Sequence, residues 1–171
     1  MVNIYSFLPI TSPDARVLIL GSMPGERSLA AGQYYAHPHN IFWKVFGELI
    51  GAGSDMIYAR RLEILKAHRI GLWDVMESCS RKGSLDSAIE ESSIRPNNFA
   101  ELYLRHPHLT HVFFNGKKAE ASYKRYVSKS LDPSHAHLHY KSLPSTSPAN
   151  ASINYQDKKR AWEEILRATL I

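Results

Sequence analysis

Residues 21–25, Gly-Ser-Met-Pro-Gly, are the first of three segments whose composition suits chemistry on a small ligand. Glycine lets the backbone approach a ligand closely, and a turn here directs amide N–H groups towards an oxyanion, a phosphate or an anionic leaving group. The segment has neither the Gly-Lys-Ser/Thr of a Walker loop nor the Gly-x-Gly-x-x-Gly of a dinucleotide fold. It predicts a site built from backbone donors; the alternative is an ordinary strand-to-helix turn.

The second segment, residues 33–43, reads Gln-Tyr-Tyr-Ala-His-Pro-His-Asn-Ile-Phe-Trp. The aromatic ring of Tyr35 suits stacking on a flat base, and core packing is its alternative. Asn40 stands where the N-cap of the following helix is expected. Its carboxamide oxygen is also able to accept a hydrogen bond from water and orient it. His37 and His39 lie only two positions apart, which is too little for a metal site without other ligands. We expect no metal site and no cofactor.

The third segment, residues 143–150, reads Leu-Pro-Ser-Thr-Ser-Pro-Ala-Asn. Two prolines make a rigid loop, and its short polar side chains suit contacts to a phosphodiester backbone, which position nucleic acid without reading its sequence. A helix-capping loop is the alternative. The candidate nucleic-acid contacts are Ser145, Thr146, Ser147, Pro148 and Asn150.

Continuous apolar runs predict strands that are buried on both faces, as in a parallel sheet. These runs lie at residues 16–20, 70–73, 111–114 and 139–143. Amphipathic stretches and capping residues predict helices between them. The helices are expected at residues 42–50, from Ser54 or Asp55 to about His68, from Asn97 or Asn98 through Leu104, and at residues 117–129 and 157–170. The alternation predicts a three-layer α/β/α sandwich around a central, mostly parallel four-stranded sheet.

Ligands of such sheets bind beyond the carboxyl ends of the strands. In this sequence those ends carry residues 21–25, Asp74, Asn115 and residues 144–150. The predicted site is therefore the crevice that these segments share.

The composition is that of an ordinary globular chain: 171 residues, 44% hydrophobic and 22% charged, with no linker that divides it. We expect one domain over residues 1–171. The single cysteine excludes a disulfide framework and a multi-cysteine iron–sulfur or zinc site, and it suits a cytoplasmic location. No apolar run is long enough to span a membrane. The net charge of +5 permits a nucleic-acid partner, and short basic clusters such as residues 81–82 and 158–160 are typical of solvated surfaces or phosphate contacts.

Taken in order, the three segments resemble the uracil-DNA glycosylase superfamily, and most closely its hypoxanthine-DNA (deoxyinosine) glycosylase family. The stretch Ala-His-Pro-His-Asn-Ile-Phe-Trp-Lys is also similar to the related mismatch-specific uracil-DNA glycosylases. The resemblance spans residues 17–150 and implies an enzyme that extrudes a deaminated base from DNA and hydrolyses its N-glycosidic bond.

The resemblance also implies roles for individual residues. Asn40 would be the catalytic residue, Tyr35 would stack on the extruded base, and Asn115 would bind the edge of the base. Residues 145–148 would hold the DNA backbone. Backbone groups would line the base pocket at Gly21, Ser22, Met23, Pro24 and Gly25.

Three departures distinguish this chain from its relatives. Met23 stands where they carry a water-binding asparagine or aspartate, Leu143 replaces a catalytic histidine or asparagine, and Ser147 replaces the leucine that enters the DNA groove. Asn40 then remains to orient the attacking water, while the backbone of residues 21–25 stabilises the departing base. The only lysine at the three segments is Lys44, which directly follows the second one and belongs to the helix after Asn40. Schiff-base lyase chemistry is therefore unsupported, and a monofunctional glycosylase is expected.

Other readings remain open at this point. Asp74 is a candidate to contact the water or position Asn40, and a cap on the following turn is its alternative. The chain is also interpretable as a mismatch-specific uracil-DNA glycosylase, as a catalytically weak DNA-binding relative, or as a hydrolase of small phosphorylated nucleosides. We expect a monomer that binds DNA and no membrane.

Overall fold

The computed structural model, which describes residues 2–171, is built on a four-stranded parallel sheet in the order β3-β2-β6-β7. Its strands are β2 (Val17–Gly21), β3 (Ile70–Asp74), β6 (His111–Asn115) and β7 (His139–Leu143). Each predicted strand is confirmed to within one residue at either end. Gly21 pairs with Asp74 at the carboxyl end, so these two residues are neighbours across the ladder.

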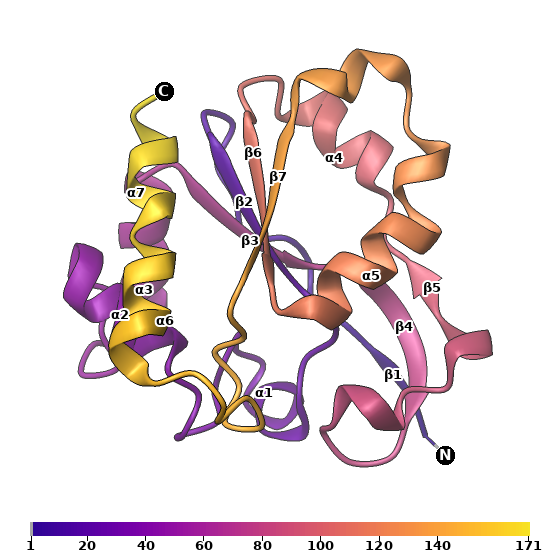
Figure 1. Cartoon of the computed structure of the whole chain (residues 1–171), viewed down its shortest axis with the longest axis horizontal. Helices are drawn as coiled ribbons and strands as arrows, with labels where there is room; N and C mark the ends of the chain where they lie inside the picture. Colours follow the sequence, from indigo (N-terminus) through magenta and orange to yellow (C-terminus); the bar gives the residue numbers. More distant parts are fainter. Residues whose placement is uncertain (1) are drawn as a thin grey trace.

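The strands β2, β3 and β6 are covered on both faces, as their apolar runs predict. The same expectation is wrong for β7, which lies at the edge of the sheet and is exposed at its first three residues. Val17 and Ile19 of β2 belong to one hydrophobic cluster, and Leu18 and Leu20 belong to the other. In Figure 1 the helices α2, α3, α6 and α7 lie on one side of the sheet and α4 and α5 on the other, which confirms the three-layer sandwich. Successive side chains of a strand point to opposite faces, so one short strand supplies both cores.

The predicted helices are present, with changes at their ends. They are α2 (Phe42–Ile50), α3 (Tyr58–Ala67), α4 (Phe99–Arg105), α5 (Lys117–Tyr126), α6 (Tyr155–Trp162) and α7 (Glu164–Thr169). A further short helix, α1 (Glu26–Ala31), is not predicted. Asn98 caps α4 through its side chain, as expected. The expected start of α3 at Ser54 or Asp55 is wrong: the chain turns there, with the Met56 amide bonded to the Gly53 carbonyl, and the helix begins at Tyr58. The expected helix over residues 157–170 is divided into α6 and α7.

A second, antiparallel sheet is not predicted by the sequence pattern. It contains β1 (Val2–Tyr5), β4 (Met76–Arg81) and β5 (Arg95–Pro96) in the order β1-β4-β5. Single-turn helices at Asp86–Ala88 and Glu91–Ser93 connect β4 to β5. This sheet carries a small hydrophobic cluster of its own, which includes Met23, Met76 and Cys79.

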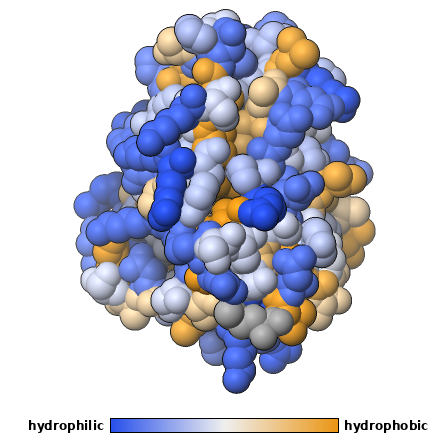
Figure 2. Space-filling model, turned by 90° about the vertical axis from the view of Figure 1, so that its right-hand side faces the viewer, coloured by the Kyte–Doolittle hydropathy of each residue, from blue (hydrophilic) through white to orange (hydrophobic). Residues whose placement is uncertain are grey.

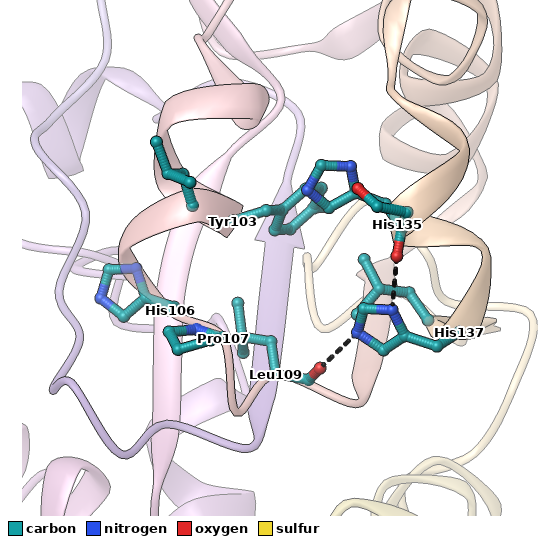
Figure 3. A pocket seen from close by; sticks show the side chains of 9 residues that line it. Tyr103, His106, Pro107, Leu109, His135 and His137 are labelled. Atoms are coloured by element: carbon teal, nitrogen blue, oxygen red, sulfur yellow. Dashed lines mark hydrogen bonds between the residues drawn. The ribbon is translucent and has the colours of Figure 1, made fainter.

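A pocket of about 200 Å³ between α4 and the Pro133–His137 turn collects three histidines, His106, His135 and His137 (Figure 3). Ring nitrogens of all three lie within hydrogen-bond distance of backbone carbonyls: Leu102 for His106, Asp132 for His135, and both Ser134 and Leu109 for His137. Within residues 2–171 no cluster of three His, Cys, Asp or Glu side chains is arranged to hold a metal ion. These imidazoles therefore help to fix the backbone ahead of β7.

Candidate active site

A cleft of about 730 Å³ opens at the carboxyl ends of the parallel strands. This volume lies within the range of about 300–1,000 Å³ that is usual for small-molecule sites, so a purine fits inside it. Every residue that the sequence assigns to the site lines the cleft: Gly21, Ser22, Met23, Pro24, Gly25, Tyr35, Asn40, Asn115, Ser145, Thr146, Ser147, Pro148 and Asn150. The three segments therefore form one site.

Gly21 ends β2 against the carboxyl group of Asp74. A Cβ atom at residue 21 would lie 2.5 Å from Asp74 Oδ1 and 3.3 Å from the Tyr35 hydroxyl, so no larger residue fits without displacing them. The glycine therefore lets a carboxyl group and a phenol reach the same point at the bottom of the cleft.

The side chains of Ser22 and Met23 are engaged in the surrounding structure. The Ser22 hydroxyl donates a hydrogen bond of 2.7 Å to Asp86 Oδ1. Met23 is buried and packs in the hydrophobic cluster with Met76 and Cys79. Because these side chains are occupied, this part of the wall offers the ligand mainly backbone groups.

Tyr35 has a backbone φ of +55°, in the left-handed region that non-glycine residues rarely adopt. The conformation turns its ring onto Phe42, with ring centroids 4.0 Å apart and planes inclined by 20°. The Ala36 amide donates to Ser28 Oγ at 3.1 Å, which fixes the next residue. Phe42 thus supports the Tyr35 ring from behind at the wall of the cleft.

Asn40 lines the cleft directly before α2. Its Oδ1 accepts a hydrogen bond of 3.0 Å from the Phe42 amide, so the side chain caps the first turn, although the helix boundary falls at Ile41. An amide oxygen has two lone pairs, and this bond uses one of them. The capping bond fixes the orientation of the carboxamide and leaves acceptor capacity for a water molecule.

Asn115 and Thr146 form a reciprocal pair. Asn115 Nδ2 donates to Thr146 Oγ1, the Thr146 amide donates to Asn115 Oδ1, and both distances are 2.9 Å. The Ile41 amide donates to the Thr146 carbonyl at 3.1 Å. Thr146 therefore ties β6, the 144–150 loop and the start of α2 together. One N–H of Asn115 and one lone pair of its Oδ1 remain for a base edge.

The 144–150 loop is also held from behind. Trp162 Nε1 donates to the Pro144 carbonyl at 2.9 Å, and the ammonium group of the buried Lys158 binds the Asn150 carbonyl. The loop therefore meets a ligand as a formed surface.

Residues 84–87 form a wall of the cleft that the sequence does not assign to it. Ser84 Oγ accepts a hydrogen bond from the Glu26 amide at 2.9 Å. Beneath this wall Arg81 is buried, and its guanidinium donates to the carbonyls of Pro24 and Gly83. In the sequence Arg81 belongs to a basic pair of the kind found on solvated surfaces, and only its place on β4 reveals that it braces two walls.

Asp74 is the most strongly perturbed acid of the cleft. Its side chain is buried, and burial raises its pKa to about 7; the negative charge of Asp86 raises it further and Arg81 opposes the change. Burial and the nearby Asp74 also raise the pKa of the Tyr35 hydroxyl, which stays neutral near neutral pH. The floor of the cleft is therefore able to hold an exchangeable proton.

The cleft above the parallel sheet combines three features: the aromatic ring of Tyr35, the fixed carboxamide of Asn40 and a floor lined by the backbone of residues 21–25. Together these features define a class of protein. The chain belongs to the uracil DNA glycosylase superfamily, whose family model matches residues 8–169.

Two curated relatives are named hypoxanthine DNA glycosylase. The protein from Methanosarcina acetivorans is 37% identical over 164 residues, and the one from Methanosarcina barkeri is 38% identical over 164 residues. Each alignment covers 94% of this chain and 96% of the relative. A solution NMR structure from M. acetivorans, provisionally assigned as a uracil DNA glycosylase, matches with a TM-score of 0.80 at 35% identity, over 99% of this chain and 100% of that one.

Proposed function

We propose that this chain is a monofunctional DNA glycosylase that hydrolyses the N-glycosidic bond of deaminated bases, hypoxanthine foremost, and leaves an abasic site for base excision repair. The observation that carries the proposal is the joint placement of Tyr35 and Asn40 in a cleft large enough for a purine. The near full-length similarity to proteins named hypoxanthine DNA glycosylase supports the same substrate.

In this mechanism the extruded base stacks on the free face of Tyr35, because Phe42 covers the other face. Asn40 accepts a hydrogen bond from a water molecule and directs its oxygen at C1′ of the deoxyribose. The C1′–N9 bond breaks through a sugar with oxocarbenium character, and the backbone of residues 21–25 stabilises the charge that moves onto the base. An amide is not a base near neutral pH, so the role of Asn40 is orientation.

We propose that the 144–150 loop contacts the DNA backbone through Ser145, Ser147, Pro148 and Asn150, with Thr146 fixing its position. Across the cleft, Leu85 is 57% exposed between Ser84 and Asp86, which are both bonded to the 21–26 segment. Apolar wedges support an extruded nucleotide by entering the base stack. Since Ser147 is too small and polar for that role, we assign the wedge to Leu85.

We further propose that residues 1–171 act as one domain, as a monomer and in the cytoplasm. The two hydrophobic clusters that share the parallel sheet support a single unit. The face over the smaller sheet and α5 is largely hydrophilic, with its hydrophobic atoms in separate small groups (Figure 2), which suits a solvated surface. In residues 2–171 no helix has the length and apolar character needed to cross a membrane.

The direct test is single-turnover cleavage of an oligonucleotide with one deoxyinosine, with abasic sites revealed by alkali. Asn40→Ala is expected to lower the rate by about 10²–10³-fold, a loss typical of one transition-state hydrogen bond. Because Asn40 also caps α2, Asn40→Ser serves as the matched control: it keeps a capping oxygen and the melting temperature but loses the carboxamide. If Asn40→Ser cleaves at the wild-type rate, Asn40 is only a cap and the mechanism is wrong.

A mismatch-specific uracil-DNA glycosylase is the second candidate, favoured by the provisional uracil assignment of the solved structure. Matched oligonucleotides with one deoxyinosine or one deoxyuridine separate the two. Faster cleavage at deoxyinosine is expected, and equal or faster cleavage at deoxyuridine would reverse the assignment. Binding to DNA without cleavage of either would identify a catalytically inactive relative.

A further inference from the structure

The cleft holds two polar atoms that the fold leaves without partners. Asp74 Oδ2 and the Tyr35 hydroxyl are both buried, and neither makes a hydrogen bond of good geometry within residues 2–171, although the side chain of Asn115 lies close enough to the hydroxyl to oppose the rise in its pKa. A buried polar group without a partner costs about 1–3 kcal/mol, so such groups in a cleft indicate a ligand that satisfies them.

The carboxyl group of Asp74 and the hydroxyl of Tyr35 both lie beside Gly21. Asp74 Oδ1 and the Tyr35 hydroxyl lie 2.5 and 3.3 Å from the position that a Cβ of residue 21 would take. Asp74 ends β3 beside Gly21, where its side chain is 3% exposed yet lines the cleft. A purine stacked on Tyr35 with its sugar at the mouth would direct its far edge, with O6, N1 and N7, at this point.

Resting on the function proposed above, we propose that Asp74 is a catalytic residue that, as the carboxylic acid, donates a proton to hypoxanthine as the base departs. The C1′–N9 bond breaks and its electron pair passes to the base. The Asp74 O–H proton moves to O6 or N7 of that base, and the oxygen of water bonds to C1′. One proton of this water stays on the new C1′ hydroxyl group and the other goes to solvent, from which Asp74 is reprotonated. Hypoxanthine then leaves as a neutral molecule.

The surroundings keep a large fraction of this carboxyl group protonated at neutral pH. Tyr34 and Tyr35 approach it from the 34–35 segment, Tyr58 from α3, Arg81 from β4 and Asp86 from the turn after β4. Burial raises the pKa of all three tyrosines, so they remain neutral, and Arg81 favours ionisation of Asp74. Burial and the charge of Asp86 outweigh Arg81 and bring the pKa of Asp74 to about 7.

The test is the pH dependence of single-turnover cleavage of the deoxyinosine oligonucleotide from pH 5.5 to 9. The wild-type rate is expected to fall about tenfold per pH unit above pH 7, as the acid form is depleted. Asp74→Asn, which donates a hydrogen bond but no proton, is expected to react about 10²–10⁴-fold more slowly at pH 6, with no falling limb. Asp86→Asn is expected to move the limb to lower pH, because it removes the charge that raises the pKa of Asp74.

A second measurement separates catalysis from folding. Asp74→Asn is expected to bind an oligonucleotide with a reduced abasic site within about twofold of wild type, because that ligand has no base for Asp74 to contact. A wild-type rate that is flat or rises through pH 7, or a falling limb that persists in Asp74→Asn, would overturn the role of Asp74 and leave the glycosylase intact. Failure of the wild type to cleave deoxyinosine at any pH would instead contradict the proposed function.

Discussion

At the residue scale, Tyr35 is held in an energetically unfavourable state. Its left-handed backbone costs about 1–3 kcal/mol for a non-glycine residue, and its buried hydroxyl is unpartnered within the described chain. Strained residues persist only where the surroundings hold them, and here Phe42 and the Ser28–Ala36 hydrogen bond do so. In this conformation Tyr35 presents one face of its ring to the cleft.

We expect Tyr35→Ala to slow excision of hypoxanthine by about 5–150-fold, because base–aromatic stacking contributes about 1–3 kcal/mol. Tyr35→Phe keeps the ring and removes the unpartnered hydroxyl, so it is expected to melt at a higher temperature and to lose only a few-fold in rate. Single-turnover rates and thermal melting curves measure both effects. Equal rates for the Ala and Phe variants would show that the ring does not contact the base.

Sequence reasoning reaches some of these residues and not others. Asn40 and Tyr35 are expected at the site because their segment resembles that of the glycosylase family; the residue types alone leave a helix cap and core packing as alternatives, and the structure places both residues in the cleft. The raised pKa of Asp74 is not predictable from the sequence, because it comes from burial beside Gly21 and from the charge of Asp86, which is not adjacent in sequence. The sequence likewise does not show that the polar bonds of Asn115 go largely to Thr146.

At the element scale, the strands of the parallel sheet are predictable and the second sheet is not. An uninterrupted apolar run such as Val17–Leu20 is readable because both faces of the strand are buried. β1 is exposed at three of its four residues, and β4 mixes buried with exposed positions, so neither has a clear period. β1 and β4 pair over a long distance in the sequence, so their pairing is not visible in a local pattern. The cleft wall that follows β4, at residues 84–87, is not predictable for the same reason.

That wall supports a prediction about Leu85. Leu85→Ala is expected to slow cleavage of deoxyinosine in duplex DNA by about tenfold or more, because the extruded nucleotide loses the wedge that holds it out. The rate on single-stranded DNA is expected to stay within about twofold, since no duplex has to be opened. Because Leu85 is exposed, the melting temperature of the Leu85→Ala variant is expected to equal that of the wild type and serves as the control. Equal losses on both substrates would assign Leu85 to the base pocket.

At the scale of the whole molecule, Asp74 links the site to folding stability. Its pKa is 3.8 in the reference state and about 7 in the folded chain, so the folded state holds the proton more tightly. As pH rises from about 4 to 7 the unfolded chain ionises first, and the free energy of unfolding therefore falls. Above pH 7 the loss of folding stability is complete, and it amounts to about 1.4 kcal/mol for each unit by which the pKa of Asp74 differs between the folded and unfolded states.

Asp74→Asn removes this dependence while keeping the size of the side chain. We expect the variant to melt at the same temperature as wild type near pH 4 and above it at pH 8. Other acids, such as Glu48 and Glu91, have pKa values lowered by ion pairs and stabilise the fold as pH rises. Their effect is the same in both proteins, so it cancels in the difference between the two melting temperatures. A difference that shrinks with rising pH would show that Asp74 is stabilised as the carboxylate.

The burial of Met23 has a consequence for how this chain can evolve. Its side chain packs with Met76 and Cys79 in a small core, and the residue also lines the cleft. Replacing it with the asparagine or aspartate that the resemblance implies for related glycosylases would bury a polar group among apolar ones and leave a void. A single substitution at residue 23 is therefore expected to destabilise the fold, and a lineage starting here must also rebuild the packing of this small core.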